Sequence, residues 1–201
     1  FSEWKSDAAI LCMDGIGAPW VEEFLTGFEQ NLSSDQTLIV DESHRLGIVS
    51  THIKTPADLV QTSSMSKAFG IPAGIILGKK STIEEIKKDP FWVGGSPANP
   101  AYVYACLHAQ EAYDERIMQS QELAKSFSQH VLPVNAVTNY PAFSSADPKL
   151  FEHLKSHGFL CNQFAYPDPS AVPLCKAILP ACLTWKDIED LSNALSTYEK
   201  A

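Results

Sequence analysis

The sequence predicts an α/β fold, and two observations lead to that class. Short apolar runs alternate with amphipathic stretches through the first part of the chain, which is typical of strands and helices in a mostly parallel sheet. From about residue 134 the pattern becomes strand, helix, strand, strand, helix, which is the order of a small α+β unit. We therefore expect a first domain over residues 1–130 that ends in a long linking helix, and a second over 131–201.

Four apolar runs mark the strands expected in the first domain. Ala8–Met13 is continuously apolar, as a parallel strand buried on both faces requires. The runs Leu38–Val40, Ala57–Thr62 and Ala73–Gly78 follow, with turn-forming residues between them. Between the first two runs, apolar residues recur at helical spacing over Trp20–Asn31.

The remaining elements follow from the same patterns. Helices are expected over Thr82–Lys88 and from Pro100 to about His130, where Pro133 closes the helical stretch. The second domain is expected to contain strands over Val137–Phe143, Phe159–Phe164 and Leu174–Leu179 and helices over Pro148–His157 and Thr184–Tyr198. Thr184 suits the N-cap of the last helix.

Composition excludes several classes of partner. The 201 residues carry a formal net charge of −9 with no basic cluster, which argues against nucleic-acid binding. No apolar run approaches the roughly 20 residues of a membrane-spanning helix, and the start of the chain shows no signal-peptide pattern. We therefore expect a cytoplasmic protein that does not bind membranes. The start at Phe1, close to a strand, favours a piece of a larger protein.

Metal binding and disulfide bonds are not expected either. The five cysteines are an odd number without a C-x-x-C pair, which favours free thiols in a reducing compartment. His153 and His157 lie four residues apart and can in principle share a metal ion. Without a third ligand at useful spacing, a solvated helix face is the more probable interpretation.

Two segments contain most of the side chains that could bind a cofactor or react. The segment Asp41 to Gly47 (DESHRLG) follows a buried strand, and Thr62 to Gly70 (TSSMSKAFG) is a hydroxyl-rich turn with one lysine. In open α/β sheets, ligands bind at the carboxyl ends of the strands, where both segments are expected. Small hydroxyl residues suit a phosphate group, and a lysine among them suits a carbonyl cofactor.

These two segments, in this order, resemble the core motifs of the pyridoxal-phosphate (PLP)-dependent α-oxoamine synthases, a branch of the class I/II aminotransferase superfamily. The family patterns are D-E-A/S-H-x-x-G and S/T-x-S/G-K-A/G-x-G, and this chain contains both. The resemblance covers the carboxy-terminal portion of the family. It implies the later strands of the large domain followed by the small domain.

The resemblance also implies roles for individual residues. Lys67 would carry the cofactor as a Schiff base and act as acid and base. Asp41 would hold the pyridinium nitrogen protonated, and His44 would bond the phenolate oxygen of the ring.

Four serines would surround the same cofactor. Ser43 would let the ring lie flat against the strand end, and Ser64, with help from Ser66, would bind the phosphate. Ser96, in a Gly-Gly-Ser-Pro stretch, would reach the phosphate of a partner subunit, because the family builds its sites at a homodimer interface.

The function that the resemblance implies is a PLP-dependent acyltransferase of the 8-amino-7-oxononanoate synthase type. It would condense an amino acid with an acyl-CoA thioester and release carbon dioxide. Two alternatives stay open: an aminotransferase or lyase reaction on the same cofactor, and a non-catalytic docking module. Taken singly, Asp41, His44 and Lys67 are each more often ordinary surface residues.

One departure leaves the substrate open. The family has an arginine before a proline that binds the substrate carboxylate, and this chain has Tyr166 at the corresponding place. A phenol cannot form the bidentate pair that suits arginine to carboxylates. Lys176, on the next expected strand, is a candidate to replace it as a point charge.

Overall fold

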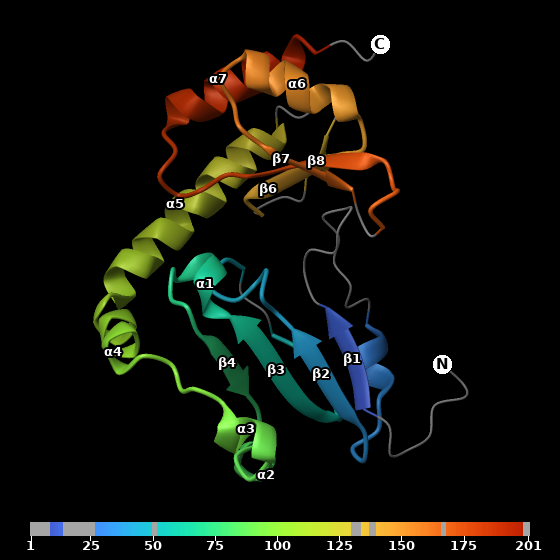
Figure 1. The fold of residues 1–201 in the computed structure, drawn as a ribbon, viewed down its shortest axis with the longest axis vertical. Helices are drawn as coiled ribbons and strands as arrows, with labels where there is room; N and C mark the ends of the chain where they lie inside the picture. The colour runs from blue at the N-terminus through green and yellow to red at the C-terminus, as the bar shows by residue number, and fades with distance from the viewer. Residues whose placement is uncertain are drawn as a thin grey trace. The chain divides into compact units, whose positions relative to one another are not determined.

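The computed structural model describes residues 9–13, 27–49, 52–129, 134–136, 140–165 and 168–198. The chain divides into two compact units (Figure 1). Unit 1 comprises Phe1–Gly15 and Glu23–Gln110, and unit 2 comprises Ile16–Glu22 and Glu111–Ala201. This grouping places nearly all of the long helix α5 (Gln110–Gln129) in unit 2. The domain division at residue 130 stays a prediction from the sequence.

Unit 1 is built on a mixed four-stranded sheet. Its strands are β1 (Ala9–Met13), β2 (Thr37–Asp41), β3 (Asp58–Ser64) and β4 (Gly74–Leu77), in that spatial order. Strands β1, β2 and β3 are parallel, and β4 runs antiparallel to β3, as the arrows in Figure 1 show. The carboxyl ends of β2 and β3 therefore meet at one edge of the sheet.

The side chains of β2 alternate between a fully buried face and a half-buried face. Leu38 and Val40 are fully buried and pack with Ala57, while Ile39 and Asp41 lie on the opposite face and are half-buried. Because successive side chains of a strand point to opposite faces, Asp41 at the end of β2 lies on the face opposite Val40.

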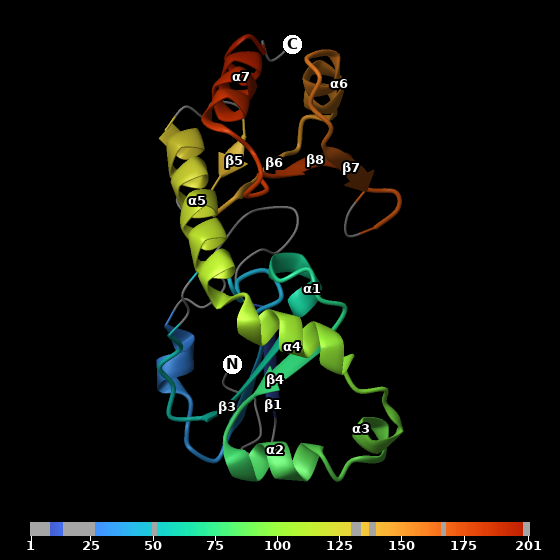
Figure 2. The same ribbon diagram turned by 90° about the vertical axis from the view of Figure 1, so that its left-hand side faces the viewer.

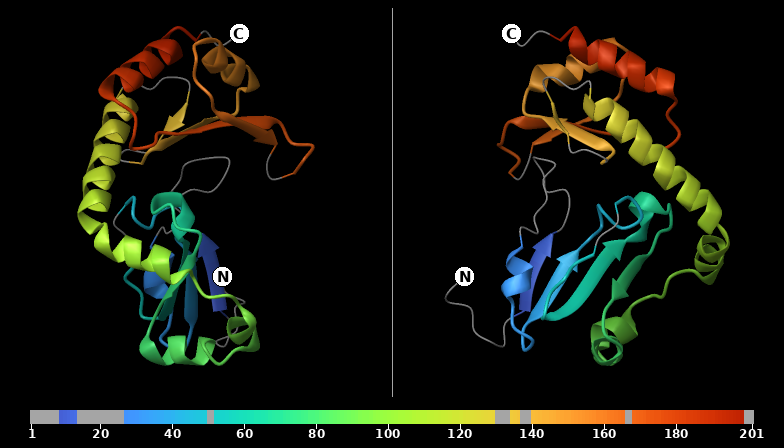
Figure 3. Two further views of the ribbon diagram at one scale, coloured as in Figure 1. Left: turned by 60° about the vertical axis from the view of Figure 1, so that its left-hand side comes forward. Right: turned by 180° about the vertical axis from the view of Figure 1, so that it is seen from behind.

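Short helices connect and follow the strands of unit 1. They are the 3-10 helix η1 (Phe28–Asn31), α1 (Met65–Ala68), α2 (Lys80–Ile86), α3 (Pro90–Gly94) and α4 (Pro100–His108). Helices α3 and α4 both begin with a proline, and the side chains of Asp89 and Asn99 cap their first turns. Figure 1 and the right-hand view of Figure 3 show the sheet from opposite sides, and no described helix lies across its middle in either of these two views.

Unit 2 is an antiparallel sheet with helices on one face. The strands β5 (Asn135–Ala136), β6 (Ala142–Ser145), β8 (Pro173–Ile178) and β7 (Asn162–Ala165) are neighbours in that order. Helices α5, α6 (Pro148–Ser156) and α7 (Trp185–Ser196) stand on the same side of this sheet (Figure 2).

The core of unit 2 fills the space between these helices and the sheet. Phe143 from β6 stacks on Phe127 from α5 with ring centroids 5.0 Å apart. Leu150 and Leu154 of α6 and Leu191 of α7 complete the centre of a cluster of eleven buried residues. Spacing of three and four residues on each helix brings the apolar side chains to one face.

The fold class predicted from the sequence is confirmed, and the predicted N-cap is present. The Thr184 side chain accepts from the Asp187 backbone N–H while the Asp187 carboxylate accepts from Thr184, which forms a capping box. The expected helix over 100–130 is interrupted at Ala109 and becomes α4 and α5. The sequence missed the short helices α1 and α3.

Strand bounds differ in two places. β7 begins at Asn162 rather than near Phe159, and β6 covers only the end of the expected strand, of which residues 137–139 lie outside the described residues. Most of the helix expected over Trp20–Asn31 also lies outside them.

The described helices and cysteines bear on two further expectations. Within the described ranges, no helix is both long and apolar enough to cross a membrane. The described cysteines carry free thiols; Cys106 and Cys175 are buried, Cys161 is half-buried and Cys182 is exposed.

Candidate active site

Two chain segments that leave neighbouring parallel strands form the candidate site. Asp41 ends β2, and its register partner on β3 is Thr62, so these two side chains share a face of the sheet. β3 continues two residues further to Ser64, and α1 begins immediately after it. The residues that the sequence singled out on both segments thus reach the same edge of unit 1.

The lysine and the histidine of the two motifs are in contact. Lys67 Nζ lies 3.0 Å from His44 Nε2. When Lys67 is protonated its amine donates this bond, which requires the His44 tautomer with the proton on Nδ1. The backbone that carries Lys67 is held by hydrogen bonds from Met65 N–H to Ala73 O (2.9 Å) and from Phe69 N–H to Met65 O (3.0 Å). A one-turn helix therefore fixes the lysine between β3 and β4.

Asp41 is kept in its anionic form. Burial alone would raise its pKa, but hydrogen bonds from the Ser43 side chain and backbone and the nearby charge of Lys67 lower the pKa below its ordinary value of 3.8. The Ser43 N–H donates to Asp41 Oδ1 at 2.9 Å. The strand end thus presents a carboxylate next to a nitrogen base and an amine.

Three serine hydroxyls join the two segments. The Ser64 N–H donates to Ser43 Oγ at 2.9 Å, and this bond crosses from one motif to the other. Ser64 Oγ lies 2.7 Å from Ser66 Oγ and caps α1 by accepting from the Ser66 N–H at 3.3 Å. Neighbouring hydroxyls and backbone N–H groups of this kind can bind phosphate oxygens.

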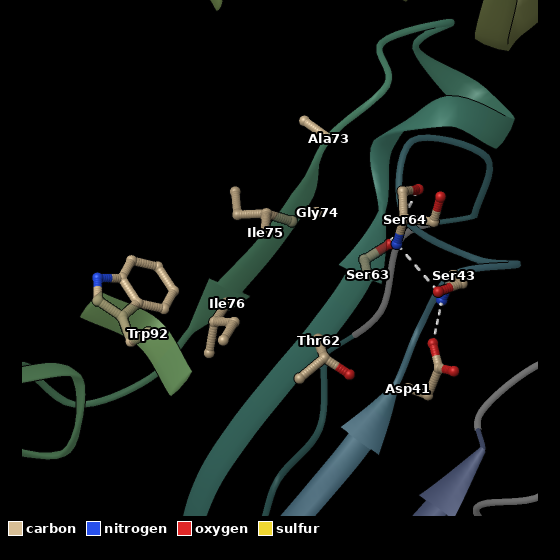
Figure 4. A pocket seen from close by; sticks show the side chains of 10 residues that line it. All are labelled: Asp41, Ser43, Thr62, Ser63, Ser64, Ala73, Gly74, Ile75, Ile76 and Trp92. Carbon is tan, nitrogen blue, oxygen red and sulfur yellow. Dashed lines mark hydrogen bonds between the residues drawn. The ribbon is translucent and has the colours of Figure 1, made fainter. Parts of the chain in front are cut away.

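A cavity of about 520 Å³ opens beside these residues (Figure 4). At one end it is lined by Asp41, Ser43 and Ser64, and at the other by Ile75, Ile76 and Trp92, with Thr62, Ser63, Ala73 and Gly74 between them. Its volume is within the usual range for small-molecule sites of roughly 300–1,000 Å³. Within it, a polar end that can bind charge adjoins an apolar end.

Sequence reasoning missed residues that support the site from the other face. Glu42 is only 2 % exposed, and its Oε2 accepts from Gln61 Nε2 at 2.8 Å. The Glu42 N–H also bonds Thr62 O at 2.8 Å, so this residue ties the end of β2 to β3. The position of Glu42 inside the motif was visible in the sequence, but its burial was not.

A close packing contact joins the last residues of the two motifs. Gly47 has φ +74°, and a Cβ added to it would lie 2.6 Å from Cζ of Phe69. Glycine is therefore needed there both for its backbone conformation and for space. The Phe69 ring lies against the turn that carries His44.

One predicted site residue is not brought to this group. Ser96 is exposed between α3 and α4, and across the described ranges no hydrogen bond joins it to the residues around Lys67. Its expected role across a dimer interface stays a prediction. Tyr166 lies outside the described residues.

His153 of α6 and His157, which follows the end of that helix, do not share the solvated face that was expected, because His157 is exposed but His153 is half-buried. His153 Nε2 lies 2.7 Å from Ala194 O on α7, and the His153 and His157 rings are 4.3 Å apart. Among the described residues, no three His, Cys, Asp or Glu side chains are grouped so that they could hold a metal ion.

Known proteins similar to this chain fall into one group of enzymes. No protein-family model matches the chain. The 8-amino-7-oxononanoate synthase of Thermosipho melanesiensis is 29% identical over 217 residues, which cover 95% of this chain and 53% of the relative. The Petrotoga mobilis enzyme of the same name is 27% identical and covers 95% and 52%. The chain therefore spans about half the length of the curated relatives that it matches.

Solved structures show the same fold at lower identity. A Sphingomonas wittichii serine palmitoyltransferase has a TM-score of 0.70 at 14% identity and covers 98% of this chain and 56% of its own. The 8-amino-7-oxononanoate synthase of Francisella tularensis has a TM-score of 0.70 at 15% identity, with coverage of 97% and 64%. The resemblance to α-oxoamine synthases that the two motifs predicted is confirmed, with only part of each neighbour matched.

Proposed function

We propose that this chain is the lysine-bearing part of a PLP-dependent acyltransferase of the α-oxoamine synthase type. Such an enzyme condenses an amino acid with an acyl-CoA thioester and releases carbon dioxide. The observation that carries the proposal is the 3.0 Å contact of Lys67 with His44 beside the anionic Asp41, at the carboxyl edge of the sheet. The relatives named 8-amino-7-oxononanoate synthase support the same class.

The groups at this edge match the chemistry of PLP. Its aldehyde needs an amine, which Lys67 offers, and its ring nitrogen needs a carboxylate, which Asp41 offers. Its phosphate needs hydroxyl and N–H donors, which Ser64 and Ser66 offer at the start of α1. Donors for all three parts of the cofactor lie on two adjacent segments, so the residues present fit it.

Each side chain has a defined task in the reaction. The Lys67 amine would hold the cofactor, and the same Nζ could hold and move a proton at the substrate carbon. Asp41 would accept a hydrogen bond from a protonated ring nitrogen, and its lowered pKa would keep it able to do so. His44 Nε2, which lies next to Nζ, would orient the amine and the ring oxygen. Bound PLP supplies the electron sink for the charge left when carbon dioxide departs.

The finer assignments form part of the same proposal. They are an 8-amino-7-oxononanoate synthase reaction in biotin biosynthesis, a cytoplasmic homodimer in which Ser96 reaches the partner's cofactor phosphate, and no nucleic-acid or membrane partner. The names of the curated relatives support the reaction. The net charge of −9 supports the exclusion of nucleic acid.

Covalent trapping tests the cofactor assignment. The chain is mixed with PLP, reduced with borohydride, digested and mapped by mass spectrometry. The fixed cofactor is expected on Lys67, and Lys67→Arg should abolish it because a guanidinium does not form the reducible adduct. Lys80→Arg, a matched change at an exposed lysine of α2, should leave the label on Lys67 unchanged. Equal labelling of several exposed lysines, or none on Lys67, contradicts the proposal.

Product analysis separates the acyltransferase from an aminotransferase. The protein is supplied with PLP and amino acids, with and without an acyl-CoA. Release of CoA thiol together with carbon dioxide, dependent on both substrates, is the expected result. Formation of a keto acid without consumption of acyl-CoA would instead support the transaminase alternative.

A further inference from the structure

Two cysteines of unit 2 lie next to each other across a pair of strands. Cys175 is in β8, directly opposite Gln163 of β7, and Cys161 comes immediately before the first residue of β7. Residues two apart along a strand project to the same face, so Cys161 is a diagonal neighbour of Cys175 on one face of the sheet. Both belong to the core of unit 2, because Cys175 is one of its buried residues and Cys161 packs against them.

The two thiols are joined by a hydrogen bond. The Cys175 thiol donates to the Cys161 sulfur, and this bond lowers the pKa of Cys161, although burial acts in the opposite direction. The same bond, followed by burial, raises the pKa of Cys175. The pair therefore combines a thiol that ionises more readily than an ordinary cysteine with a neighbour that stays protonated.

The two thiols also differ in their access to solvent. Cys161 is half-buried, whereas Cys175 is fully buried. A small oxidant can therefore reach Cys161 first, and the thiolate is the form of cysteine that reacts with it. An accessible thiol of lowered pKa with a second thiol beside it is the arrangement that redox-sensing proteins use.

The position of Cys161 before the strand allows the two sulfur atoms to join. A disulfide needs Cα atoms within roughly 7 Å of each other, and diagonal residues held in a ladder are about 7–8 Å apart. Pairing of β7 with β8 begins only at Asn162, so the ladder does not fix the distance from Cys161 to β8. A small movement of this segment brings the pair within range. The strain that remains makes such a bond easy to reduce again.

We propose that Cys161 and Cys175 are a reversible redox pair that a peroxide oxidises to an intramolecular disulfide. The Cys161 thiolate attacks one oxygen of hydrogen peroxide and becomes a sulfenic acid as the O–O bond breaks. The hydroxide that leaves takes up the proton lost from the Cys161 thiol and forms water. The Cys175 sulfur then attacks the Cys161 sulfur, and the S–O bond breaks as the S–S bond forms. A second water leaves with the Cys175 proton, so two electrons from the sulfurs reduce one peroxide to two waters.

Peptide mapping of the oxidised chain tests this pair. The full chain is treated with a limiting amount of hydrogen peroxide, blocked with iodoacetamide and mapped by mass spectrometry without reduction. The main disulfide is expected between Cys161 and Cys175, and dithiothreitol should restore both thiols. In urea, Cys175 and Cys182 should pair instead, because they are closer along the chain and a shorter loop closes more readily. A folded chain that pairs other cysteines, or that oxidises Cys161 without forming a disulfide, overturns the proposal.

Three serine variants test the order of the two steps. Cys175→Ser keeps a hydroxyl that can donate to Cys161 but cannot form the disulfide, so the sulfenic acid on Cys161 should accumulate and be captured by dimedone. Cys161→Ser should lose the disulfide and leave Cys175 without a dimedone adduct, because its sulfur is buried. Cys182→Ser, the matched change at an exposed thiol, should keep the disulfide. Capture on Cys175 in place of Cys161 would overturn the roles assigned to the two thiols.

These measurements are independent of the cofactor. The mapping uses the wild-type chain, so it decides whether the pair forms even where a change at the buried Cys175 lowers stability. No step requires PLP, and a missing disulfide is therefore distinguishable from a failure of cofactor trapping on Lys67.

Discussion

The candidate site lies in unit 1 of this chain, whereas the larger hydrophobic core lies in unit 2. Unit 2 packs three helices on one face of its sheet and buries a cluster of eleven residues. In unit 1, the described residues of the corresponding cluster are Leu38, Val40 and Ala57, yet this unit holds Asp41, Lys67 and the cavity. The reactive groups therefore lie on strand ends that are supported mainly by backbone and serine hydrogen bonds.

Both units expose apolar side chains, and in unit 1 several of them lie on α3 and α4. Phe91 is 92 % exposed and Val93 71 % exposed at α3, and Tyr104 and Leu107 on α4 are 65 % and 67 % exposed. All four belong to unit 1. Exposed apolar side chains that are contiguous are typical of interaction surfaces and ligand-binding grooves.

Removal of a ring from the core of unit 2 is expected to have the largest effect on stability. Phe143→Ala deletes a fully buried side chain that stacks on Phe127, and it should lower the free energy of unfolding of unit 2 by about 4 kcal/mol. The measurement is urea unfolding followed by circular dichroism. Phe91→Ala, the same change at an exposed position, should cost less than about 0.5 kcal/mol. Similar losses in both variants would contradict this description of the core.

The corresponding truncation in unit 1 is expected to cost less. Leu38→Ala removes a side chain that is fully buried, but the small cluster around it can collapse more easily, which places the loss near 2–3 kcal/mol. Leu77→Ala, 40 % exposed on β4, is the control and should cost under about 1 kcal/mol. A loss for Leu38→Ala larger than that for Phe143→Ala would reverse the comparison between the units.

Loss of a single hydrogen bond in unit 2 is expected to have the smallest of these effects on stability. Tyr198 OH donates to Asp147 Oδ2 at 2.6 Å, and Tyr198→Phe should cost about 1 kcal/mol at neutral pH. Burial, followed by this bond and the charge of Asp147, raises the pKa of Tyr198 from 10.0 to about 12. The stabilisation is therefore full below pH 10 and is lost as the pH rises toward 12.

The control for this prediction is the pH dependence itself. Unfolding midpoints of the wild-type chain and of Tyr198→Phe should converge as the pH rises through this range. A constant difference up to pH 12 would show that the phenol does not titrate as the structure indicates.

The resemblance to known motifs singled out Asp41, His44, Ser64 and Lys67, and the roles that it implies for them stay predictions. Their common place at one edge of the sheet follows from the parallel pairing of β2 and β3, because the carboxyl ends of neighbouring parallel strands meet at one edge. Trp92 was not predictable, because its place in the cavity depends on a short helix that leaves little periodic signal.

Tertiary packing also decided two features that the sequence pattern did not predict. No glycine or proline occurs near the break at Ala109, so no strong helix-breaking residue marks it in the sequence. Glu42 lies between two predicted site residues but projects to the opposite face, where it is buried. Its role in holding β2 to β3 depends on Gln61, a contact that local pattern does not predict.

The packing of Phe69 against Gly47 means that the two motifs should change together. Any side chain at position 47 meets the aromatic ring, so a Gly47→Ala variant is expected to be tolerated only when a smaller residue replaces Phe69, and even then the positive φ remains unfavourable. Directed evolution of the turn that carries His44 should therefore use libraries that randomise both positions at once. Transfer of one motif from a distant homologue without the other would combine residues at positions 47 and 69 that do not fit together sterically.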